Sequence, residues 1–107
     1  MKKELRYYLT PGGKAAFAEW IKKIKDHTTQ SRIDRRLERM EFGNYGDYKS
    51  LGGGVYELRL AFGPGYRVYF AVQNEVIVLL CGGDKSSQDR DIEIAKQCWK
   101  ELRSRKL

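Results

Sequence analysis

Apolar and polar residues alternate at the start of the chain, where Leu5, Tyr7 and Leu9 are separated by Arg6 and Tyr8. This period of two is typical of a strand with one buried face. It predicts a first strand over residues 5–9.

Two segments follow in which apolar residues recur at helical spacing. These residues are Phe17, Ile21 and Ile24 in the first segment, and Ile33, Leu37 and Met40 in the second. The first helix begins after Thr10-Pro11, since threonine caps helices and proline suits their first turn, and reaches about residue 25. The second reaches about residue 42. The connection at residues 26–29 is short and polar, so we expect an antiparallel helical hairpin.

The centre of the chain predicts three further strands. Residues 43–54 are rich in glycine and polar residues and predict a loop. Alternation resumes over residues 55–62 and 66–72, and residues 76–81 form an apolar run of the kind buried on both faces. A last helix is predicted from the spacing of Ile92, Ala95, Trp99 and Leu102.

The predicted order, β-α-α-β-β-β-α, defines an α+β fold. We expect a single domain over residues 1–107, with a mainly antiparallel sheet and the helical hairpin packed on one side. We expect the polar face of the central strands to be exposed to solvent. All helices would then cover the other, apolar face, on which the helical hairpin packs.

The charge of the chain favours a polyanionic partner. There are 21 Lys and Arg residues against 14 Asp and Glu, a net charge of +7. Residues 1–42 hold 11 basic and 6 acidic side chains, so most of the excess lies there. A small basic domain of this kind points first to nucleic acid.

Other classes of protein are disfavoured by the same sequence. No apolar run approaches the ~20 residues of a membrane helix, and we expect a cytoplasmic protein without a membrane partner. Cys81, Cys98 and the single His27 lack the spacing of a zinc site, so we expect no metal and no cofactor, with both thiols in or near the core.

Two arginines on the central strands require an explanation. Alternation places Glu57 and Arg59 on one face of their strand, and Arg67 and Tyr69 on the same face of the next. One interpretation is a pair between Glu57 and either arginine on an exposed sheet, worth ~0.2–1 kcal/mol. The other is an anion site, because the guanidinium fork matches a phosphate.

Lys85 favours the second interpretation. It follows Gly82-Gly83, at a tight turn, and precedes a helix whose first N–H groups and dipole attract an anion. The stretch from Gly82 to Ser86 lacks the spacing of a Walker A loop. We therefore predict that Arg59, Arg67, Lys85 and the helix end converge on one phosphate.

Three blocks of this sequence resemble the RelE/ParE superfamily of bacterial toxins. They are Gly54-Val-Tyr-Glu-Leu-Arg59, Phe62-Gly-Pro-Gly-Tyr-Arg67-Val-Tyr-Phe70, and Leu79-Leu-Cys-Gly-Gly-Asp-Lys-Ser-Ser-Gln88 with Asp91-Ile92. The similarity extends over about residues 4–103 and is strongest to the HigB-like addiction module killer proteins related to phage Gp49. It implies a toxin of a type II toxin–antitoxin module. RelE-like members cleave mRNA at the ribosomal A site, and the partner is an antitoxin, often a helix-turn-helix DNA-binding protein.

The resemblance assigns roles to individual residues. Arg67 matches the arginine that RelE-type toxins place on the scissile phosphate, Arg59 matches a second basic position, and Lys85 matches a basic residue after the last strand. The lysine pair of RelE is missing, with Val55 and Glu57 near those places, and its C-terminal tyrosine has no clear equivalent.

The implied chemistry is metal-independent attack of a ribose 2′-OH on the adjacent phosphate, which needs a base, an acid and cations around the transition state. We hypothesise that Glu57 is the base, that Arg59 and Arg67 hold the phosphate, and that Lys85 stabilises charge or protonates the leaving group.

The basic helices suggest a docking surface for mRNA or ribosomal RNA. Tyr69 is a candidate for stacking on a base. The basic candidates are Lys22, Lys23, Lys25, Arg32, Arg35, Arg36 and Arg39. Two alternatives stay open: a ParE-like toxin that inhibits gyrase without nuclease chemistry, since one fold serves both, and a non-enzymatic nucleic-acid-binding module.

Overall fold

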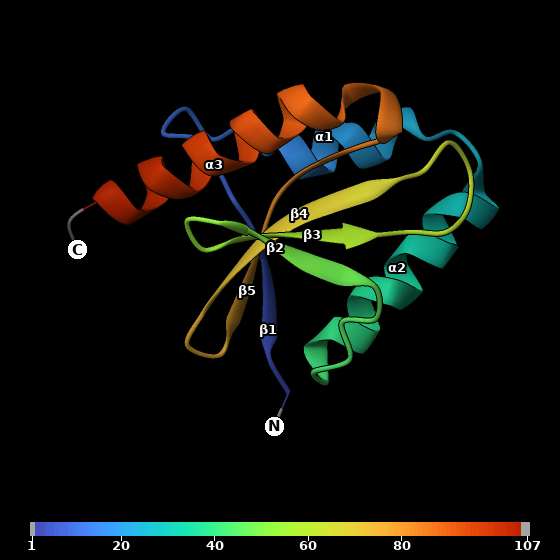
Figure 1. Cartoon of the computed structure of the whole chain (residues 1–107), viewed down its shortest axis with the longest axis horizontal. Helices are drawn as coiled ribbons and strands as arrows, with labels where there is room; N and C mark the ends of the chain where they lie inside the picture. Colours follow the sequence, from blue (N-terminus) through green and yellow to red (C-terminus); the bar gives the residue numbers. More distant parts are fainter. Residues whose placement is uncertain (1, 106–107) are drawn as a thin grey trace.

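The computed structural model describes residues 2–105 and is built on a five-stranded sheet (Figure 1). The strands lie in the order β1-β5-β4-β3-β2. β1 pairs with β5 in parallel, and every other pair is antiparallel. Their bounds are β1 Glu4–Tyr7, β2 Tyr48–Gly52, β3 Val55–Arg59, β4 Arg67–Gln73 and β5 Val76–Gly83.

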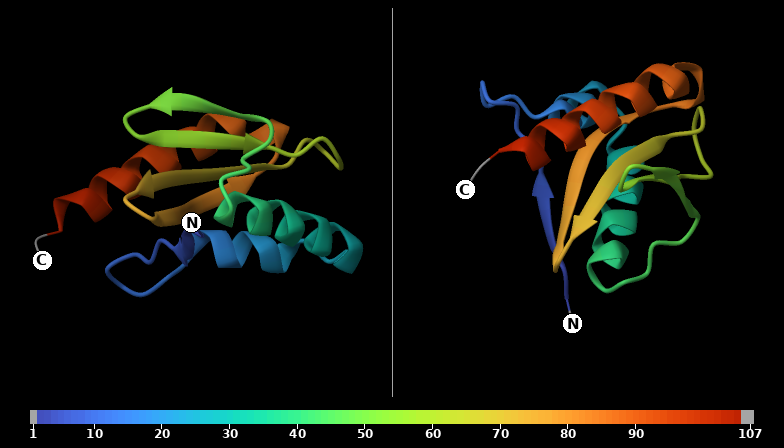
Figure 2. Two further views of the ribbon diagram at one scale, coloured as in Figure 1. Left: turned by 90° about the horizontal axis from the view of Figure 1, so that it is seen from below. Right: turned by 60° about the vertical axis from the view of Figure 1, so that its left-hand side comes forward.

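Helices cover both faces of this sheet. α1 (Ala16–Lys23) and α2 (His27–Glu41) lie together on one side, whereas a short 3₁₀ turn, η1 (Lys85–Ser87), leads into α3 (Gln88–Ser104) on the other (Figure 2). Asp26 caps α2 by accepting a hydrogen bond from the N–H of Thr28 at 3.1 Å. The Gln30 side chain donates to the carbonyl of Ile24 at 2.6 Å, which joins the end of α1 to the start of α2.

Two apolar cores result, one on each face of the sheet. Phe17 of α1 and Ile33 of α2 pack with Leu58, Val68 and other strand residues that point to the hairpin side. The opposite core contains the α3 residues Ala95 and Trp99. Its strand residues include Val55, Tyr69, Ala71, Val78 and Leu80. Cys81 is buried there and Cys98 is half-buried, both free thiols, as predicted.

The predicted α+β class and mainly antiparallel sheet are confirmed, and the predicted elements occur in the expected order with one strand added. Two details were wrong. Residues 48–52, predicted as loop, form the edge strand β2, whose mostly exposed residues lack the alternation that marks a half-buried strand. The third helix covers the face that was predicted to be exposed to solvent. Tyr69 and Glu57, whose polar groups suggested an exposed face, are both buried beneath it.

Two adjacent glycines allow helices to approach β5 from opposite sides. A Cβ on Gly82 would overlap the indole of Trp20, and a Cβ on Gly83 would overlap the carboxylate of Asp91. The strand therefore carries no side chain where α1 and α3 come closest to it.

Replacing Gly82 with alanine is expected to lower the free energy of unfolding by about 1–3 kcal/mol, the usual cost of overpacking. Urea denaturation measures it. Gly12→Ala is the matched control, because the nearest atom to its new Cβ would be 3.8 Å away. Equal stability of the two variants would contradict the assigned packing.

Candidate functional site

Glu57 is a fully buried carboxylate at the centre of a polar network under α3. One oxygen, Oε1, accepts a hydrogen bond from Nε of Arg59 at 3.2 Å. The other, Oε2, accepts one from Nε2 of Gln88 at 2.8 Å and lies 3.8 Å from Nε of Arg67. A pair between Glu57 and one of the two arginines was one of the two predicted interpretations; the structure pairs Glu57 with both, in a buried site and not on an exposed sheet.

The surroundings of Glu57 keep it ionised. Burial by itself raises the pKa of this carboxyl, but hydrogen bonds from Gln88 and Arg59 and the positive charges of Lys49 and Arg67 lower the pKa below its ordinary value. An enclosed carboxylate of low pKa is a poor acceptor for a proton of a bound substrate. The hypothesis that Glu57 is the general base is therefore not supported, and its geometry is that of an anchor for two arginines.

Arg59 and Arg67 are direct cross-strand partners on β3 and β4. The Arg59 side chain is 40% exposed and the Arg67 side chain 14%, so Arg59 reaches solvent while Arg67 lies deeper. Nη1 of Arg67 donates to the carbonyl of Gly65, whereas its buried Nε has no hydrogen-bond partner. Arg67 thus holds a fixed, largely desolvated charge next to an exposed one.

Lys85 lies beside this pair. Its N–H donates to the carbonyl of Pro64 at 3.4 Å. A Cβ placed on Gly65 would be 2.9 Å from Nη1 of Arg67 and 3.3 Å from Cβ of Lys85. The backbone positions of Arg59, Arg67 and the exposed Lys85, which we call the cationic cluster, are therefore neighbours at one end of the sheet.

The expected contribution of the helix end to an anion site is not borne out by the local geometry. The carboxylate of Asp84 accepts hydrogen bonds from the N–H of Ser86 at 2.8 Å and from its hydroxyl at 2.6 Å. The pKa of Asp84 is lowered, chiefly by the Ser86 hydroxyl. The anion at this turn is the carboxylate of Asp84, so the first N–H groups of this helix end are already occupied by the protein's own side chain.

Tyr69 is fully buried and cannot stack on a base. It lies opposite Glu57 in the β3–β4 pairing, and burial, followed by the charges of Glu57 and Asp91, raises the pKa of its phenol. The prediction that Tyr69 contacts RNA is wrong, because α3 covers the face on which it lies.

The arginines of α2 form a second basic surface. All four border a groove together with Ala61 and Phe62 of the β3–β4 connection. They are Arg32, Arg35, Arg36 and Arg39. The guanidinium of Arg32 lies over the Phe62 ring, 4.0 Å from its centroid. This connection starts after Arg59 and ends before Arg67, so the arginine groove, on the α2 side of the sheet, and the cationic cluster, on the α3 side, both border it.

The remaining predicted lysines stand apart from this surface. Lys22 and Lys23 form the exposed last turn of α1, and Lys25 follows it. Sequence reasoning also missed Gln88, which binds Glu57 from the first residue of α3. A glutamine at a helix start carries no signal in the sequence, since its role depends on the strand it meets.

Across residues 2–105 no helix is both long and apolar enough to cross a membrane. The same residues contain no group of three or more His, Cys, Asp or Glu side chains placed to hold a metal ion.

Comparison with known proteins agrees with this architecture. The family model "Phage derived protein Gp49-like (DUF891)" matches residues 19–100. An uncharacterized protein of Haemophilus influenzae is 51% identical over 87 residues, which make up 80% of this chain and 88% of that protein. A double mutant of the Escherichia coli toxin RelE, solved in the free state, superimposes with a TM-score of 0.65 at 18% identity. That match covers 91% of this chain and 98% of the RelE chain.

The family match spans most of the chain, and the structural match shows a shared fold with RelE. This chain is therefore a member of the Gp49-like family with a RelE-like toxin fold.

Proposed function

We propose that this protein is the toxin of a type II toxin–antitoxin module and that it cleaves mRNA on the ribosome. The observation that supports the proposal is the cationic cluster, in which Arg59 and Arg67 are cross-strand partners and the backbone of Lys85 lies beside the turn that precedes Arg67. Family membership and the RelE-like fold support the same assignment.

The cluster suits a reaction at a phosphodiester. In the proposed step the ribose 2′-oxygen bonds to the adjacent phosphorus, the bond from phosphorus to the 5′-oxygen breaks, and a 2′,3′-cyclic phosphate forms. Arg67 and Arg59 hold the phosphate and offset the charge that develops on it. The exposed ammonium of Lys85 donates a proton or a hydrogen bond to the leaving 5′-oxygen. Because Glu57 is enclosed, the proton of the 2′-hydroxyl passes to solvent water.

The arginine groove on α2 extends this site. A strand of RNA held at the cationic cluster meets Arg32, Arg35, Arg36 and Arg39 where it crosses the β3–β4 connection. We propose that these arginines bind the backbone of mRNA or ribosomal RNA, with Lys22, Lys23 and Lys25 adding charge on the same side of the sheet. Such contacts weaken with added salt.

A toxin of this kind requires a neutralising antitoxin, and we propose a helix-turn-helix DNA-binding protein in this role. The experiment that tests the function is controlled expression in bacteria, followed by mapping of transcript 5′ ends. Translation arrest with new ends inside ribosome-bound coding regions is the expected result. Intact transcripts with a DNA-damage response would instead indicate a gyrase inhibitor and overturn the nuclease assignment.

A further inference from the structure

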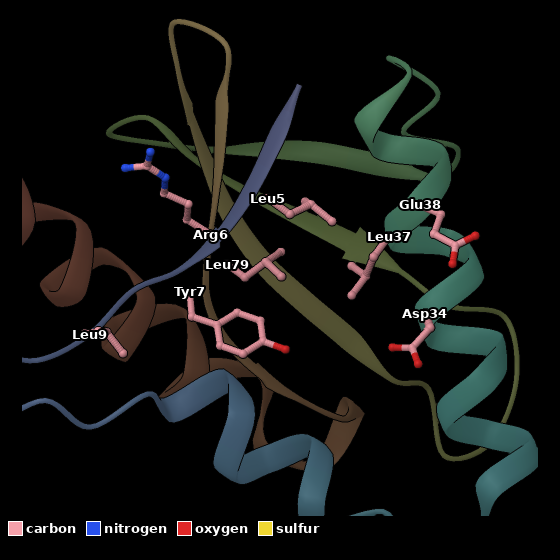
Figure 3. A pocket seen from close by; sticks show the side chains of 8 residues that line it. All are labelled: Leu5, Arg6, Tyr7, Leu9, Asp34, Leu37, Glu38 and Leu79. Atoms are coloured by element: carbon pink, nitrogen blue, oxygen red, sulfur yellow. The ribbon is translucent and has the colours of Figure 1, made fainter. Parts of the chain in front are cut away.

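A groove of about 680 Å³ lies between β1 and α2, away from the cationic cluster (Figure 3). Leu5, Leu37 and Leu79 turn into it, while Arg6 turns away (Figure 3). Tyr7 and Leu9 are about half exposed at its border. A volume of this size is typical of a binding pocket, and an apolar lining next to exposed large side chains is typical of a surface that is covered in a complex.

The groove runs along an unpaired sheet edge, because β1 is the last strand in the order. The N–H of Glu4 donates to the carbonyl of Glu75, just before β5, and the N–H of Tyr8 donates to the carbonyl of Leu79, in the middle of β5. Backbone groups alternate along a strand, so those of Leu5 and Tyr7 point outward from the sheet. At Lys3 the outward N–H already donates to the carbonyl of Glu41, so α2 closes one end of the edge and leaves Leu5–Tyr7 open.

Two carboxylates border the groove on α2. Asp34 and Glu38 are both exposed and stand at i and i+4, a like-charge spacing that costs a helix about 0.2–0.5 kcal/mol. Neither lies within 4.0 Å of a cationic nitrogen of residues 2–105. In a chain of net charge +7, two neighbouring carboxylates without counter-ions indicate a positively charged ligand at this place.

We propose that the β1–α2 groove binds an extended segment of a partner protein, which adds a strand to the β1 edge and turns apolar and basic side chains toward α2. Main-chain hydrogen bonds to Leu5 and Tyr7 supply affinity. Every second side chain of the segment contacts the groove, which provides specificity. The apolar side chains cover the partly exposed Leu5 and the exposed Tyr7 and Leu9, and the basic one meets Asp34 and Glu38.

Two other occupants fit less well. Phosphate groups of RNA would meet the carboxylates of Asp34 and Glu38. A second copy pairing through β1 would present Leu5 and Tyr7 to the groove and keep Arg6 on the opposite face, so the carboxylates would stay without a cation. The observations therefore favour a different protein segment.

The test uses a capped peptide, acetyl-Thr-Leu-Thr-Lys-Thr-Val-Thr-amide, in which leucine, lysine and valine share one face. The control peptide has glutamate in place of lysine. Each is titrated into the full chain and into the Asp34→Lys/Glu38→Lys variant, with affinity and amide hydrogen exchange followed by NMR. We expect the original protein to bind the lysine peptide at least about tenfold more tightly and to protect the amides of Leu5 and Tyr7.

The charge-reversed variant is expected to prefer the glutamate peptide, a reversal that loss of folding cannot produce. Equal affinities for both peptides, or binding that leaves the Leu5 and Tyr7 amides unprotected, would overturn the proposal. So would a concentration-dependent dimer of the original protein that the charge reversal disrupts, since a second copy would then occupy the groove. None of these outcomes depends on RNA cleavage.

Discussion

Arg67→Ala is expected to lower the rate of mRNA cleavage by about a hundredfold or more. Removal of a single preorganised donor to a developing oxyanion typically has this effect, and the charge of Arg67 is held in place by Glu57 and by the carbonyl of Gly65. The measurement is single-turnover cleavage of a defined mRNA on purified ribosomes. Arg67→Lys keeps the charge without the planar fork, and an intermediate rate is expected.

The matched control is Arg6→Ala, which removes an exposed arginine from the opposite edge of the sheet and is expected to cleave at the original rate. Circular dichroism shows whether each variant is folded. If a folded Arg67→Ala protein cleaved mRNA at the original rate, the proposed role of Arg67 in the reaction would be wrong.

Glu57→Ala is expected to lower the free energy of unfolding by about 3 kcal/mol or more. Loss of one partner of a buried ion pair leaves the other charge uncompensated, and Arg67 is largely desolvated. Arg59 adds less, since water reaches it. Glu57→Gln keeps the shape and part of the hydrogen bonding, so its loss should be smaller. Urea unfolding at neutral pH measures both.

The pH dependence separates charge from packing at Glu57. The pKa of this carboxyl is lower in the folded protein than in the unfolded chain, so its ionisation stabilises the fold above the ordinary carboxyl pKa of about 4.3. This contribution is lost as the pH falls through the folded-state pKa. The stability difference between the original protein and Glu57→Gln should therefore shrink as the solution is acidified below about pH 4.3. A difference that stays constant would indicate a packing role without a charge role.

Much of the candidate site follows from the period of the strands. A period of two puts Glu57 and Arg59 on one face, and the same period in the next strand puts Arg67 and Tyr69 on one face. The short turn after Gly83 places Lys85 next to the end of β4. The faces of the strands are local consequences of backbone geometry and are visible without a tertiary structure, whereas the position of Lys85 beside β4 depends on the pairing of β5 with β4.

The hydrophobic periods, the basic charge and the side-chain chemistry of the cluster were therefore set by the sequence alone. Whether solvent or a helix covers the sheet face that carries Glu57 and Tyr69 was decided by the tertiary structure. Periodicity tells which residues lie together on a face, but not whether water or another element covers it. Docking of α3 turned Glu57 and Tyr69 from expected surface residues into buried ones, and it brought Gln88 to Glu57, which is 31 residues away in the chain. The groove at the β1 edge likewise exists only because α2 packs beside a strand that ends the sheet.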